Sequence, residues 1–121
     1  MWTWSEMKRS RINPVSKKRQ QVNVLRRAFV KEILDERTRC EAQIPDVCSH
    51  WATDVHEIMT RARGGSILDP DNVLALCRRC HTFITDNPSF SQENGFTVHS
   101  WATTADLIAA DRAREVFRRE P

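Results

Sequence analysis

The stretch that decides the fold of this chain is Leu76-Cys77-Arg78-Arg79-Cys80-His81, in which a Cys-x-x-Cys pair runs directly into a histidine. A second pair, Cys40 and Cys48, lies upstream with seven residues between its members. The 28 residues between the two pairs are rich in groups that can do chemistry. They contain, in order, Asp54-Val55-His56-Glu57-Ile58, Gly64-Gly65 and Asp71-Asn72.

The two cysteine pairs predict a structural zinc site. Four thiolates at about 2.3 Å satisfy a closed tetrahedral Zn²⁺ site, and such a site contributes folding energy to a small core. The other interpretations are two disulfides in a secreted chain, or four unrelated buried thiols. The start of the sequence lacks the apolar segment of a signal peptide, so we expect a reducing, cytoplasmic location in which thiols stay available to metal. The predicted ligands are Cys40, Cys48, Cys77 and Cys80.

Length and charge narrow the function classes. The 121 residues fit one domain, and no apolar run approaches the ~20 residues that span a bilayer, so we expect no membrane association. Residues 1–39 carry eleven Lys/Arg against four acids, whereas residues 40–121 carry eight against twelve. A basic N-terminal part can attract nucleic acid through its phosphates. The alternative is an ordinary solvated helix face.

That basic part should contain one long helix. Residues 1–16 read as an irregular arm, and Ser16 is a plausible N-cap for a helix over about 17–37. Apolar residues recur at spacings of three and four, which favours packing of one face against the core. These are Val22, Leu25, Phe29 and Ile33, and the opposite face carries Lys18, Arg19, Arg26, Arg27 and Lys31.

The rest of the chain predicts an α+β fold. Residues 40–53 read as a loop or zinc knuckle, residues 54–59 and 73–76 as short strands, and a helix should run from about 77–79 to just before Pro88. Residues 89–103 look irregular, and a last helix is expected over about 104–119. The predicted organisation is a basic arm and helix (1–39), a core (40–88) and a C-terminal extension with a helix (89–121), in one compact domain.

The motifs of the core together resemble the HNH endonuclease family, the zinc-stapled ββα-metal nucleases. The resemblance covers about residues 40–86 and rests on Asp54–Ile58, Gly64-Gly65, Asp71-Asn72 and Leu76–His81, flanked by the first cysteine pair. It implies two antiparallel strands and a helix around one catalytic divalent cation (Mg²⁺, Mn²⁺, Ni²⁺ or Zn²⁺) in addition to the structural zinc. The basic helix also looks like that of small phage-encoded and bacterial members.

By this resemblance, the ligands of the catalytic cation fall on His56 and His81, and the asparagine that holds the loop falls on Asn72. The general base, usually a histidine, falls on Glu57. In the alternative, His56 is the base and Asp54 or Glu57 supplies a carboxylate to the cation. Strand alternation would place Asp54 and His56 on one face and Glu57 on the other.

The implied function is metal-dependent hydrolysis of DNA phosphodiester bonds, by nicking or double-strand cutting, with duplex DNA and a phage packaging terminase as the expected partners. Arg26 and Arg27 of the basic helix, and Arg61 and Arg63 beside the glycines, are the candidate phosphate contacts. The alternative is a zinc-stapled DNA- or protein-binding module with a weak or inactive cation site. Outside this pattern, His50 is expected at the surface or beside the site, with replacement of a cysteine as zinc ligand as the alternative. His99 is expected to pack against Trp101.

Overall fold

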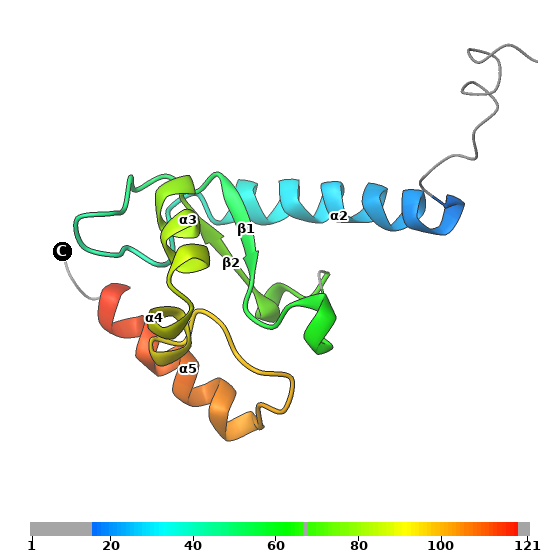
Figure 1. Cartoon of the computed structure of the whole chain (residues 1–121). Coiled ribbons are helices and arrows are strands. Elements are labelled where there is room, and N and C mark those ends of the chain that lie inside the picture. Colours follow the sequence, from blue (N-terminus) through cyan, green and yellow to red (C-terminus); the bar gives the residue numbers. More distant parts are fainter. Residues whose placement is uncertain (1–15, 67, 119–121) are drawn as a thin grey trace, which may run out of the picture.

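The protein has an α+β fold built on a two-stranded antiparallel sheet with helices on both faces (Figure 1). The computed structural model describes residues 16–66 and 68–118, so the predicted arm at residues 1–16 lies outside the described residues except for Ser16. The elements in chain order are α2 (Lys17–Glu36), β1 (Asp54–Glu57), the 3-10 turns η1 (Arg61–Arg63) and η2 (Pro70–Asn72), β2 (Val73–Leu76), α3 (Arg78–Asp86), α4 (Pro88–Glu93) and α5 (Thr104–Arg118).

The register of the sheet decides which side chains share a face. His56 pairs with Leu74, and Val55 pairs with Ala75. Leu74 belongs to the larger buried cluster, which includes Ile84 of α3, whereas Ala75 belongs to a smaller cluster that includes Ile33 of α2. The sheet is therefore covered by α3 on the His56 face and by α2 on the Val55 face. This sandwich confirms the predicted mixture of strands and helices.

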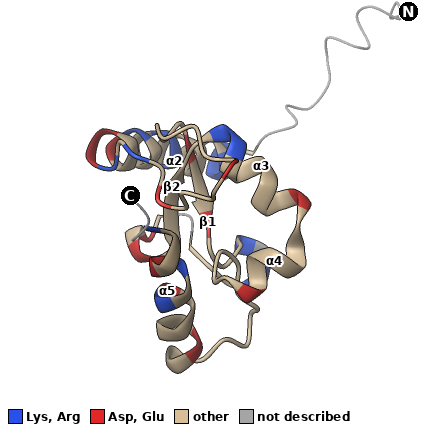
Figure 2. Cartoon of the chain, turned by 90° about the vertical axis from the view of Figure 1, so that its left-hand side faces the viewer, with Lys and Arg blue, Asp and Glu red and all other residues tan. Residues whose placement is uncertain are grey.

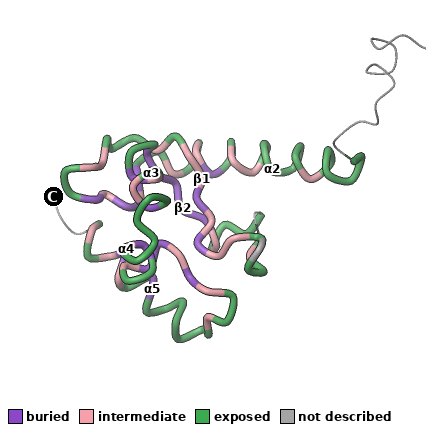
Figure 3. Tube along the Cα trace, viewed as in Figure 1, coloured by how far each residue is buried: buried purple, intermediate pink, exposed green. Residues whose placement is uncertain are grey.

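Helix α2 begins as predicted, because the Ser16 hydroxyl accepts a hydrogen bond from the backbone N–H of Arg19 at 3.1 Å. Its predicted apolar stripe is only partly correct. Ile33 is buried and Phe29 packs beside it, but Leu25 is 56% exposed. The N-terminal part of the helix extends away from the sheet and is mostly exposed (Figure 3). The sheet is only four residues long, so it can cover only the last turns of a twenty-residue helix.

Two side chains near the end of α2 tie the outer edge of β2 to the body. Arg37 donates from Nη1 to the Val73 carbonyl at 3.0 Å and from Nη2 to the Pro70 carbonyl at 2.9 Å. The Glu41 carboxylate accepts from the Ala75 N–H at 2.7 Å, and the Glu41 N–H donates to the Ala75 carbonyl at 2.8 Å. The carbonyl of Val73 and both backbone groups of Ala75 are thus paired, as buried backbone requires.

The segment after α3 contains a correction. Residues 89–103 were expected to be irregular, but α4 covers Pro88–Glu93. Proline in the first turn starts a helix without losing a hydrogen bond, so Asn87-Pro88 is a helix start rather than only the end of α3. Beyond α4, Phe96 and Ala110 enter the same buried cluster as Leu76 and Cys80. Within the described residues, no helix is long and apolar enough to cross a membrane.

Candidate functional site

The four cysteines come together in space. The Sγ atoms of Cys40, Cys48, Cys77 and Cys80 all lie within 4.8 Å of one another, and every one of these residues except Cys48 is buried. A tetrahedral zinc with Zn–S bonds of about 2.3 Å places its sulfurs about 3.8 Å apart. The cluster is therefore of the size and chemistry that hold a metal ion such as zinc, in agreement with the sequence prediction.

Backbone N–H groups are aimed at these sulfurs. The His50 N–H lies 3.3 Å from Cys48 Sγ, and the Ser49 N–H lies 3.4 Å from Cys77 Sγ. His50 adopts a positive φ of 76°, which is uncommon for a residue other than glycine. A hydrogen bond from the Cys80 thiol lowers the pKa of Cys40, and the same hydrogen bond raises the pKa of Cys80. Burial raises the pKa of Cys48. Thiolate is the form that binds metal, so these contacts suit a metal-binding cluster. The side chain of His50 is exposed, as expected.

A second polar cluster lies where β1 meets α3. Asp54 Oδ2 is 2.8 Å from His81 Nδ1 and 3.4 Å from Arg78 Nε. Burial raises the pKa of the Asp54 carboxyl, but the hydrogen bonds from His81 and Thr53 and the charge of Arg78 outweigh it, and the pKa lies below its ordinary value. Asp54 is therefore a carboxylate at neutral pH, held beside a histidine that is 28% exposed.

His56 lies next to this pair but is buried. The centroids of the His56 and His81 rings are 5.4 Å apart. His56 Nε2 is 2.7 Å from the Phe96 carbonyl oxygen. A carbonyl can only accept, so Nε2 carries the proton and Nδ1 keeps its lone pair. Burial lowers the pKa of His56, and the charge of His81 lowers it further, against the opposing effect of the Phe96 hydrogen bond. The ring is thus neutral at pH 7.

Glu57 lies on the other face of the sheet. It follows His56 in β1 and pairs with Val73, which packs in the smaller cluster against α2. Side chains alternate along a strand, so Glu57 shares the α2 face, whereas His56 shares the α3 face that holds His81. The structure thus brings Asp54, His56 and His81 together and separates Glu57 from them.

Asn72 holds the loop between the strands. Its Oδ1 accepts from the Met59 N–H at 2.9 Å, and its Nδ2 donates to the carbonyls of Met59 and Ser66, each at 2.9 Å. Gly65 lies against the same atoms, because a Cβ there would come within 1.8 Å of the Met59 oxygen. The amide and the glycine together fix how the chain leaves β1.

The predicted phosphate contacts fall into two groups. Arg26 and Arg27 are exposed on the projecting part of α2. Figure 2 marks the Lys and Arg positions of the chain in blue on the ribbon. Arg61 is exposed in η1, whereas Arg63 donates from Nη1 to the Val98 carbonyl at 3.2 Å. Arg63 therefore links the loop to the C-terminal segment as well as reaching solvent.

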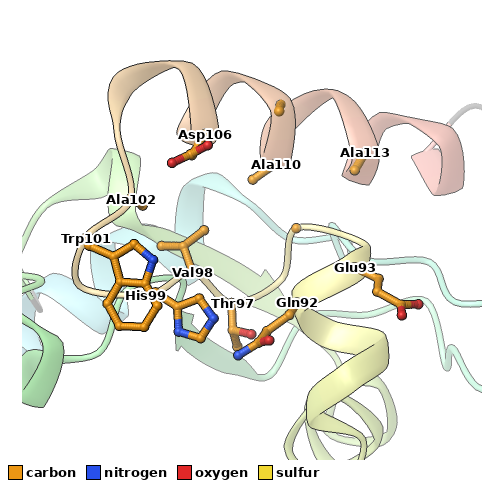
Figure 4. Close-up of a pocket in the computed structure, with 12 residues that line it drawn as sticks. Gln92, Glu93, Thr97, Val98, His99, Trp101, Ala102, Asp106, Ala110 and Ala113 are labelled. Atoms are coloured by element: carbon orange, nitrogen blue, oxygen red, sulfur yellow. The ribbon is translucent and has the colours of Figure 1, made fainter.

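The C-terminal segment forms a hollow of about 360 Å³ against α5 (Figure 4). The rings of His99 and Trp101 are stacked at its edge, with centroids 4.2 Å apart and planes at 6°. This confirms the predicted packing of His99, whose ring is not part of the cluster around His81. The same segment contains a contact that sequence reasoning missed, the Phe96 carbonyl at His56. A backbone carbonyl has no side-chain signature, so nothing in the sequence indicated it.

Among the described residues, the cysteine cluster is the one group of three or more His, Cys, Asp or Glu whose ligand atoms lie within 4.8 Å of one another. Asp54 and His81 supply only a two-residue pair. In comparisons with known proteins, no family model, no curated protein and no solved structure matches this chain.

Proposed function

We propose that this protein is a metal-dependent endonuclease of the HNH type, which hydrolyses phosphodiester bonds of duplex DNA at the cluster of Asp54, His56 and His81. A structural zinc in the four-cysteine cluster would hold the start of α3. The observation that carries the proposal is the Asp54–His81 contact of 2.8 Å, next to a buried histidine whose Nδ1 has a free lone pair.

The Asp54–His81 pair suits a divalent cation. Two neighbouring ligands of an octahedral cation at about 2.1 Å lie roughly 3 Å apart, close to the 2.8 Å between Oδ2 and Nδ1. A carboxylate and an imidazole are common ligands of Mn²⁺, Ni²⁺ and Zn²⁺, and the carboxylate also suits Mg²⁺. A cation held there would act as a Lewis acid toward a phosphoryl oxygen of the DNA.

His56 takes the role of general base, in place of the Glu57 that the sequence pattern suggested. Its Nδ1 accepts a proton from the attacking water as the water oxygen bonds to phosphorus and the P–O bond to the leaving sugar oxygen breaks. The Phe96 carbonyl holds the Nε2–H, which keeps Nδ1 available and stabilises the charge that develops on the ring. Glu57 faces α2 and is left out of this chemistry.

Asn72 keeps the loop after β1 rigid through three hydrogen bonds, which supports the precise placement that catalysis requires.

The charge of α2 favours a DNA substrate. In α2 the first fifteen residues carry six Lys/Arg and no acid, on a helix that stands clear of the body. A polyanion passing the cluster would be attracted to this helix without any reading of its bases.

A plasmid-nicking assay tests the proposal. Wild-type protein is incubated with supercoiled plasmid and Mg²⁺, Mn²⁺, Ni²⁺ or Zn²⁺, beside His81→Ala, His56→Ala and the matched control His99→Ala. We expect cleavage by the wild type and by His99→Ala, and none by the two site variants. If all four proteins cleave alike, the activity lies outside this cluster and the proposal fails. If the wild type binds plasmid without cutting it under any cation, the protein is instead a zinc-stapled binding module.

A further inference from the structure

Arg114 on α5 is a deeply buried cation whose location needs explanation. Its side chain is 8% exposed. Among the described residues, it is the only Lys or Arg that is buried. Burial of a guanidinium costs free energy unless hydrogen bonds compensate for the lost water. Burial lowers the pKa of Arg114, and the charge of Asp111 opposes that shift. Within the part of the chain that the structure describes, its Nε has no hydrogen-bond partner.

Among the described residues, the one close hydrogen bond of this guanidinium goes to a backbone carbonyl. Nη1 donates to the oxygen of Gly95, whereas Nη2 lies at a longer 3.4 Å from the half-exposed carboxylate of Asp111. Gly95 has a φ of +79°, and a Cβ at this position would come within 2.2 Å of the Ala110 oxygen. The backbone at Gly95 is thus pressed against α5 and bound to it by Arg114. Figure 4 shows α5 lying over this segment, with Ala110 directed toward it.

The next residue along the chain is the one that contacts the site. Phe96 is fully buried, its N–H donates to the Ser91 carbonyl at 2.8 Å, and its own carbonyl accepts from His56 Nε2 at 2.7 Å. A continuous path of contacts therefore runs from the Arg114 guanidinium through the Gly95 and Phe96 peptides to the imidazole of His56. His56 and Phe96 are 40 positions apart, so only the packing of the C-terminal part can bring this carbonyl to the ring.

We propose that Arg114 is a positioning residue: it holds the Gly95–Phe96 backbone against α5, and thereby places the carbonyl that keeps His56 in its Nε2–H tautomer with Nδ1 open. The part of this inference that concerns cleavage rests on the proposed function. The part that concerns the tautomer does not. The C-terminal helix is then not only a cover for the core but a support for the buried histidine of the site.

The experiment compares Arg114→Met, which fills a similar volume without a donor, with Arg114→Lys, which keeps a charged donor. The control is Arg118→Met, because Arg118 lies on the same helix and contacts the same Asp111 carboxylate at 3.4 Å. Zinc content and thermal unfolding report folding. Nitrogen NMR of labelled histidine, at neutral pH without added divalent cation, reports the His56 tautomer. Steady-state nicking gives kcat and KM separately.

In Arg114→Met we expect His56 to show a mixture of tautomers and kcat to fall roughly ten- to a hundredfold at little-changed KM, as a displaced catalytic group does. Arg114→Lys should recover most of the wild-type tautomer population and most of the wild-type kcat. Arg118→Met should match the wild type in both measurements. A folded Arg114→Met with the wild-type tautomer and kcat would overturn the positioning role while leaving the proposed function intact.

Two further outcomes separate the proposals. If the wild type does not cleave DNA, the proposed function fails, but a tautomer change in Arg114→Met still supports the positioning role. If Arg114→Met does not fold, the positioning role is tested instead by the His56 tautomer in the wild type and by the tautomer and kcat of Arg114→Lys. The inference would be overturned by an Nδ1–H tautomer of His56 in the wild type. It would also be overturned if Arg114→Lys folds but differs from the wild type in both tautomer and kcat, and Arg118→Met shows the same loss.

Discussion

His81 Nδ1 lies 2.8 Å from Asp54 Oδ2, although 27 positions separate the two residues in the chain. The contact joins the second turn of α3 to the start of β1, and His81 directly follows Cys80 of the cysteine cluster. The cluster that fixes the beginning of α3 therefore also fixes where the His81 ring meets the carboxylate. A metal bound by the cysteines would make this contact rigid. The proposed function requires such rigidity, because the catalytic side chains must be held in place.

The first prediction concerns cation affinity. Loss of a residue that only hydrogen-bonds to a metal ligand weakens metal binding roughly 10- to 100-fold. Asp54→Asn and His81→Ala should each weaken Mn²⁺ binding by more than this, because each removes a proposed ligand. Isothermal titration of zinc-loaded protein measures this affinity, with His99→Ala as the control. Unchanged Mn²⁺ affinity in both variants would show that the cation, if one binds, is held elsewhere.

The second prediction concerns the structural metal. After exhaustive dialysis the protein should retain about one zinc per chain, and Cys80→Ser should lose zinc and unfold at a lower temperature, because Cys80 is both a ligand and a buried member of the core. Elemental analysis and thermal unfolding check this. Stoichiometric zinc in a variant with all four cysteines changed to serine would contradict it.

The third prediction concerns the loop. Asn72→Ala removes three hydrogen bonds and leaves partly buried backbone groups of Met59 unpaired, so it should lower the free energy of unfolding by about 1–3 kcal/mol. It should also slow cleavage while Mn²⁺ affinity is retained. Asn94→Ala is the matched control, because the Asn94 amide donates a single hydrogen bond to the Phe90 carbonyl. Equal effects of the two variants on stability and rate would mean that Asn72 has no special role.

The fourth prediction separates the two candidate bases. His56→Gln should reduce the cleavage rate by about 10²–10⁴, the usual contribution of a general base, while Glu57→Gln should cost less than about tenfold because Glu57 lies on the α2 face. Single-turnover cleavage with saturating cation measures both. The reverse order of effects would restore Glu57 as the base and reject His56.

The fifth prediction concerns α2. Reversing the charges of Arg26 and Arg27 to Glu should weaken duplex binding equally for unrelated sequences and flatten the dependence of affinity on salt, because fewer counterions are released. Fluorescence anisotropy over a salt series measures both. The control is Arg112→Glu, an exposed arginine on α5. If the salt slope of the α2 variant equals that of the wild type, the basic face is only solvated.

Much of the local structure could be predicted from the residues alone. Ser16 marks the start of α2, the run Val73–Leu76 is a strand with all four side chains buried, and the cysteine spacings predict a cluster that the fold forms. These features depend on neighbours in the chain: a cap, a short continuous run of apolar residues, and a turn between paired ligands. Asn87-Pro88 also carries a signal for α4, because proline is favoured in the first turn of a helix.

What the sequence by itself determined is thus the set of elements apart from α4, the cysteine cluster and the alternation that places Asp54 and His56 on one face of β1. Only the tertiary structure decided that most of α2 stays exposed and that Glu57 faces α2. The same holds for the contact of the Phe96 carbonyl with His56 and for the hydrogen bond of Arg114 to the neighbouring Gly95 carbonyl. The physical reason is the range of the interactions. Caps and periodic patterns act within a few residues, whereas burial of a helix face and the reach of a carbonyl to a ring 40 positions away depend on how the elements pack.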